Sequence, residues 1–182
     1  MRFLALCLLA IAAGCGGSDG SDTPTAPPGG GAENIPCTGS YSGAVSGTFS
    51  CAVVARQSSY PTTSSLEFTV SNLQGTALDL TLQGVAWDGP MATGTYTETS
   101  TSVTSAYDLV VGGTASAPVG YALLKNWGGT DAGSFTLTLD SVAIANATST
   151  PATYTAHGTF TGTFVRVPST GTSASVTVAI TF

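Results

Sequence analysis

The sequence has very few charged residues. Of its 182 residues, 4 are Lys or Arg and 10 are Asp or Glu, which is 8% of the chain, where soluble domains average about 25%. So small a basic set excludes a nucleic-acid binder, which needs cationic side chains to neutralise phosphates. The shortage of Glu and Lys also excludes a coiled coil or a long amphipathic helix. Because the formal net charge is −6, any partner is expected to be neutral or cationic.

Histidine and cysteine are scarce as well, with one His and 4 Cys in the whole chain. A structural zinc site takes four Cys or His ligands, usually in two closely spaced pairs. The sequence contains no two closely spaced pairs of Cys or His residues. We therefore predict no metal site and no cofactor.

Hydroxyl-bearing and apolar residues are abundant. Ser and Thr together number 51, Gly adds 23, and 42% of residues are hydrophobic, with a mean hydropathy of +0.30. This hydrophobic content is too high for a charge-driven disordered chain. Thr and the β-branched residues favour strands, so the composition indicates an all-β domain.

The N-terminus has the layout of an export signal. Arg2 supplies a positive charge, and residues 3–13 form an apolar stretch of 11 residues. As a helix this stretch reaches roughly 16 Å, which is too short for a hydrocarbon core of about 30 Å. We therefore interpret residues 1–14 as a signal peptide.

The segment Ala12-Ala13-Gly14-Cys15 resembles the lipobox of bacterial lipoproteins, although Ala12 stands where Leu is usual. The resemblance implies cleavage before Cys15, acylation of that residue, and a lipid-anchored place in the bacterial cell envelope. Gly16 after the modified cysteine implies sorting to the outer membrane. Ordinary cleavage is the alternative, because Ala10-Ile11-Ala12 also fits the small-residue rule.

Cysteine arithmetic favours lipidation and a disulfide. With Cys7 lost in the signal and Cys15 acylated, Cys37 and Cys51 remain as one even pair. Because an exported protein lies in an oxidising compartment, we predict a Cys37–Cys51 disulfide.

Residues 15–36 are rich in Gly, Ser and Pro and predict a flexible tether that spans roughly 25 Å. Residues 37–182 predict one folded domain. Within it, apolar and polar residues alternate along several segments, the pattern of antiparallel strands with one face on a core: 66–70, 78–82, 103–111, 135–140 and 176–182. We expect about eight to ten strands in a two-sheet sandwich or jelly roll, with a closed β-barrel as the alternative.

Candidate catalytic groups are few. Strand parity places His157 on the polar face opposite the core, so we interpret it as a solvent-facing residue rather than a catalytic base. The carboxylates Glu67, Asp79, Asp108 and Asp140 fall at polar strand positions, where solvation explains them. The chain is therefore not expected to be an enzyme, and a hydrolase remains the last alternative.

Two loops pair a tryptophan with an aspartate: Trp87-Asp88-Gly89-Pro90, and Trp127 followed by Asp131. An exposed Trp ring can stack on a sugar while short polar groups bind its hydroxyls. The structural alternative is that each ring covers one end of the core. Our first expectation is a lipid-anchored envelope protein with a structural or interaction role. A carbohydrate- or small-ligand-binding module at Trp87, Asp88, Trp127 and Asp131 is the second, with a glycan or an envelope protein as partner.

Overall fold

The structure is a computed structural model that describes residues 34–59, 62–127, 130–167 and 174–182. The predicted signal peptide, Cys15 and nearly all of the predicted tether lie outside these residues. Where the chain is described it forms eleven strands, which are β1 (Ile35–Gly43), β2 (Gly47–Ser59), β3 (Thr62–Gly75), β4 (Asp79–Asp88), β5 (Gly94–Thr97), β6 (Val103–Thr114), β7 (Ala117–Trp127), β8 (Thr130–Ala132), β9 (Ser134–Asn146), β10 (Ala152–Val167) and β11 (Ser175–Thr181).

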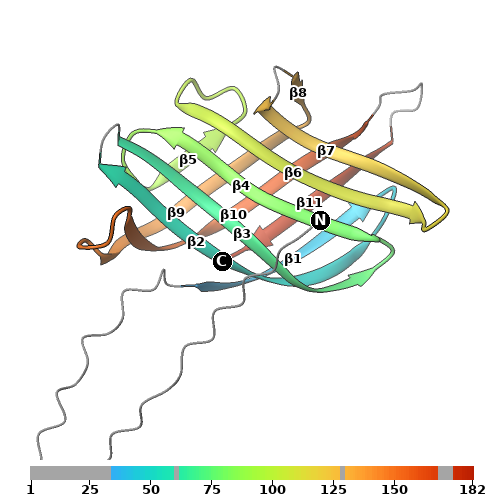
Figure 1. Cartoon of the computed structure of the whole chain (residues 1–182), viewed down its shortest axis with the longest axis horizontal. Coiled ribbons are helices and arrows are strands. Elements are labelled where there is room, and N and C mark those ends of the chain that lie inside the picture. The colour runs from blue at the N-terminus through green and yellow to red at the C-terminus, as the bar shows by residue number, and fades with distance from the viewer. Residues whose placement is uncertain (1–33, 60–61, 128–129, 168–173) are drawn as a thin grey trace, which may run out of the picture.

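The predicted all-β antiparallel fold is confirmed. The strands lie in the order β5-β9-β10-β11-β1-β2-β3-β4-β6-β7-β8, and Figure 1 shows them in two layers whose strands cross at an angle. The layers are parts of one sheet that bends over on itself. Two small strands, β5 and β8, bring the number above the eight to ten expected.

The long strand β10 connects the layers at both of its ends. Its residues Ala152–Tyr154 pair with β2, and Val165–Val167 pair with β7. The 16 residues of β10 are long enough to reach past β9 and β11 into the opposite layer. The fold is therefore sandwich-like, with backbone hydrogen bonding continuing from one layer into the other.

The core lies between the layers and is built mainly from alternate residues of the longer strands. Phe68 from β3 packs against Phe160 of β10 and against Phe182, with ring centroids 5.5 and 6.2 Å apart. The inward residues expected from the pattern 135–139 and 176–182 are all buried. Period-2 alternation thus placed these two segments correctly.

The predicted disulfide is confirmed. Cys37 and Cys51 lie directly opposite each other on β1 and β2, and their sulfurs are bonded. The fold begins slightly earlier than residue 37, because Ile35 already pairs with Val53 and is buried.

Candidate functional site

The structure brings the two Trp–Asp segments to one end of the same layer. Strand β4 ends at Asp88, β6 begins at Val103 and β7 ends at Trp127, and β6 pairs with both of the others. Because all three strands are antiparallel neighbours, the end of β4 and the end of β7 flank the start of β6 (Figure 1).

The structural interpretation of Trp87 is confirmed, and the exposed ring that the binding hypothesis needs at this position is not found. Its ring is buried, with 1% of the residue exposed, and packs on Tyr96 at a centroid distance of 4.6 Å. The indole N–H donates to the carbonyl of Pro90 at 3.4 Å. The chain after β4 therefore folds back over the ring, and Trp87 covers the end of the core. Asp88 is exposed, and the Trp127 side chain lies outside the described part of the structure.

This burial gives a spectroscopic prediction. In a Trp127→Phe variant, all tryptophan emission comes from Trp87. We expect blue-shifted emission and little quenching by iodide or acrylamide in the folded protein, with full quenching in urea. Quenching of the folded variant as strong as that of free tryptophan would contradict the buried position.

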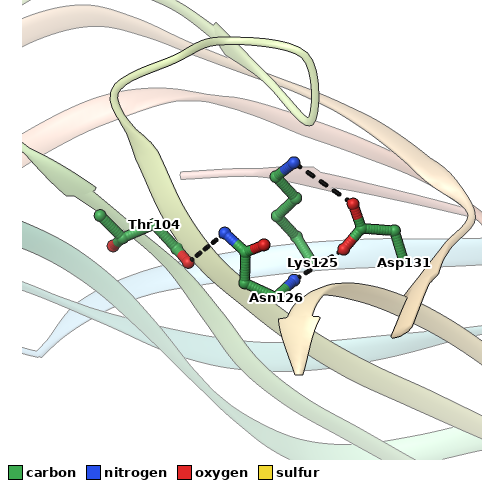
Figure 2. Close-up of polar contacts among 4 residues, drawn as sticks. All are labelled: Thr104, Lys125, Asn126 and Asp131. Carbon is green, nitrogen blue, oxygen red and sulfur yellow. Dashed lines mark hydrogen bonds and ion pairs between the residues drawn. The ribbon is translucent and has the colours of Figure 1, made fainter. Parts of the chain in front are cut away.

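Asp131 lies on β8 beside the end of β7 (Figure 2). One of its carboxylate oxygens accepts the backbone N–H of Asn126 at 2.8 Å, and the other lies 3.4 Å from the Lys125 ammonium. The amide of Asn126 in turn donates to the carbonyl of Thr104 at 2.9 Å. The hydrogen bond from Asn126, assisted by Lys125, lowers the pKa of Asp131. These contacts tie β7 to β6 and β8, so Asp131 has a structural role at this end of the layer.

His157 is exposed on the outer face of β10 opposite Ser141 of β9, as strand parity predicted. No hydrogen bond joins it to another described side chain, so the geometry adds no support to the hydrolase hypothesis. Within the described ranges, no group of three or more His, Cys, Asp or Glu side chains is placed to hold a metal ion.

The interpretation of Asp108 as a solvated strand residue is wrong. Asp108 is fully buried. One carboxylate oxygen accepts the backbone N–H of Gly84 at 3.2 Å, and the other has no hydrogen-bond partner. Burial raises the pKa of Asp108 to about 7, against the effect of the hydrogen bonds from Gly84 and Gln83.

Two irregularities explain why Asp108 points inward. The pairing of β4 with β6 shifts between Ala86 and Trp87, so the alternation along β6 changes after Val103. A second shift, between Leu82 and Gly84, forms a bulge whose Gly84 has φ +97°. The bulge frees the backbone N–H groups of Gln83 and Gly84 from the pairing of the strands, and the Asp108 carboxylate accepts hydrogen bonds from them.

A further feature was missed by the sequence analysis: an array of hydroxyl side chains on the outer face of five neighbouring strands. Directly opposite residues on β10, β11, β1, β2 and β3 form two rows across the sheet. The first row is Thr159, Thr181, Thr38, Ser50 and Ser71, and the second is Thr161, Ala179, Ser40, Thr48 and Gln74. All ten are exposed. We call these two rows the hydroxyl face.

A hollow with a volume of about 500 Å³ lies in the hydroxyl face over β11, β1, β2 and β3. Small side chains, such as Ala179 and Ser40, line it together with the amides of Asn72 and Gln74. Asn72 has φ 49° and lies in a bulge, because Asn72 and Leu73 both stand opposite Phe49. The bulge brings one more amide side chain of β3 to the hollow.

No family model matches the chain, and no curated protein or solved structure is significantly similar to it. Among the described residues, no helix has the length and hydropathy needed to cross a membrane. The case for a function therefore depends on the residues and the geometry described above.

Proposed function

We propose that this protein is a lipid-anchored lipoprotein of the bacterial cell envelope, whose β domain has an interaction role. Acylation of Cys15 would attach it to the membrane, and Gly16 favours the outer membrane. The support comes from Arg2, the apolar stretch 3–13 and the lipobox-like Ala12–Cys15 segment, together with the disulfide.

The observation that carries this proposal is where the disulfide lies. The predicted tether joins the domain at β1, and Cys37 is the third residue of that strand. Its bond to Cys51 fixes β1 to β2 at that junction. A domain held by its N-terminus transmits any pull on the anchor to the start of β1. The covalent bond then prevents β1 from peeling away beyond Ile35 and Pro36.

The disulfide also supports export, because structural disulfides persist in oxidising compartments and are rare in the cytosol. Both cysteines are buried, where reductants have poor access. Cys15 is thereby the sole cysteine of the predicted mature chain without a disulfide partner, which is the condition expected of an acylated residue.

The mass of the full chain purified from its native membrane tests this proposal. We expect a chain that starts at Cys15 and carries a diacylglyceryl group and an acyl chain, with two further cysteines that do not react with thiol reagents. A Cys15→Ser variant should lose the lipid mass and leave the membrane fraction. An unmodified wild-type chain starting at Ala13 or Gly14 would overturn the lipoprotein proposal.

A further inference from the structure

We propose that the hydroxyl face binds an elongated, neutral polysaccharide. The inference gives a ligand class to the interaction role proposed above and does not depend on the lipid anchor. It also moves the glycan site away from the tryptophan loops, where Trp87 is buried.

The first argument is hydrogen-bonding capacity. Thr38, Ser40, Thr48 and Ser50 present outward hydroxyls to the hollow, and none of them has a side-chain hydrogen bond to the protein among those found in the described residues. Each hydroxyl can donate one hydrogen bond and accept two, and each amide of Asn72 and Gln74 both donates and accepts. A sugar hydroxyl also both donates and accepts hydrogen bonds, so each one can find a partner of either kind on this surface.

The second argument is charge. The chain carries a net charge of −6, yet the two rows of the hydroxyl face contain no charged side chain. The nearest charges on β2 and β3 are Arg56 and Glu67, which form an ion pair with each other at 2.9 Å. An anionic polymer would be repelled by the net charge and would find no free cation on the face. A neutral polyol meets no such penalty.

The third argument is shape. Each row crosses five adjacent strands, and with a strand spacing of about 4.8 Å it spans roughly 20 Å. The hollow of about 500 Å³ lies within the roughly 300–1,000 Å³ typical of small-ligand sites. A surface that is long, shallow and lined with repeated hydroxyls suits several consecutive sugars of a linear chain better than one monosaccharide.

Titration calorimetry with the full chain in detergent tests the inference. The probes are hexamers of β-1,4-linked glucose, α-1,4-linked glucose and β-1,4-linked N-acetylglucosamine, with glucose and a galacturonic acid hexamer for comparison. We expect saturable binding of at least one neutral hexamer, at least about tenfold weaker binding of glucose, and no binding of the anionic hexamer.

Two variants test the location. Thr48→Val/Thr181→Val removes two hydroxyls from the face with little change in shape, and we expect about a tenfold loss of affinity or more. Ala179→Ile fills the hollow with a side chain that strands favour, and should abolish binding. Thr95→Val/Thr136→Val is the matched control, because both residues are exposed on other strands, and should bind as the wild type does.

The inference is overturned if no neutral hexamer binds, if the anionic hexamer binds more tightly, or if the Thr48→Val/Thr181→Val variant binds as well as the control. Circular dichroism and thermal unfolding of each variant separate a lost site from a lost fold. Mass spectrometry detects the acylation of Cys15 independently of glycan binding. A chain that is acylated but binds no glycan would therefore refute this inference and leave the lipoprotein proposal intact.

Discussion

Replacing Asp108 with asparagine is expected to remove most of the pH dependence of the stability of this protein between pH 4 and pH 7. In the unfolded chain the carboxyl ionises near its ordinary pKa of about 4. In the folded protein burial raises the pKa of Asp108 to about 7. Between these values the folded state holds a proton that the unfolded state has released.

The direction of the effect follows from this proton. The stabilisation from the protonated carboxyl is complete below pH 4 and is lost as the pH rises toward 7. The reason is that the free energy of unfolding decreases with rising pH wherever the folded state binds more protons than the unfolded state. At about 1.4 kcal/mol per pH unit over about three units, wild-type unfolding free energy should fall by roughly 4 kcal/mol. Above pH 7 this group adds no further change.

Urea unfolding at each pH unit from 4 to 8 measures the effect. The Asp108→Asn variant keeps an acceptor for the Gly84 N–H and cannot titrate, so its profile should be nearly flat. The control is Asp140→Asn, which removes an exposed strand aspartate and should retain the wild-type slope. Wild-type stability that rises from pH 4 to pH 7, or a slope that persists in Asp108→Asn, would refute the assignment.

Removal of the Cys37–Cys51 disulfide is the second change with a large expected effect. The bond closes a loop with a sequence separation of 14, and the chain-entropy model gives a stabilisation of roughly 3 kcal/mol for such a loop. For a domain of this size that corresponds to a fall in Tm of about 10 °C. Cys37→Ala/Cys51→Ala should show this loss in thermal unfolding.

The comparison with reduced wild-type protein isolates the covalent bond from the side-chain change. Wild-type protein that is reduced with dithiothreitol in urea and refolded in its presence should have a Tm lower by a similar amount, and the same treatment should leave the Tm of the double variant unchanged. Equal Tm values for oxidised and reduced wild-type protein would show that the bond does not stabilise the domain. The proposal that the bond fixes β1 to β2 against a pull on the anchor would then lose its support.

Sequence alone predicted the strands whose alternation is uninterrupted. Strand β11 reads Val176, Val178 and Ile180 on one face, and all three are buried. Such a strand has one register that puts its apolar residues inside, and a shift by one residue would expose all of them. The disulfide was predictable for a similar reason, since elimination left one pair of cysteines.

Strand β6 shows where this reasoning stops. The apolar residues Tyr107, Leu109 and Val111 suggested an inward face, but Ala106, Asp108 and Val110 are the buried ones. A pairing irregularity near Val103 changes the parity, and no local pattern announces it. A sequence that is apolar on both faces therefore leaves the direction of each side chain open.

The hydroxyl face was beyond prediction for a different reason. The outward Ser and Thr of each strand were visible, but their alignment into rows depends on which strands are neighbours. Thr181 lies beside Thr38 because β11 pairs with β1. Pairings between distant parts of a chain are not encoded in any short pattern. For Trp87, the usual burial of tryptophan favoured the structural interpretation, which is the one found, whereas the binding hypothesis needed an exposed ring.

The pairing of β1 with β11 also has a consequence for how the chain folds. Thr38 and Thr181 are opposite each other although almost the whole domain separates them in sequence. Contacts of such long range slow folding, because the loop-closure entropy must be overcome first, and sheets dominated by them fold in roughly milliseconds to seconds. The hairpin of β1 and β2 is local by comparison, and we expect its disulfide, once formed, to hold β1 beside β2 while β11 docks. Refolding of the reduced protein should then be slower than refolding with the disulfide intact, because β1 must find β2 again before β11 can pair with it.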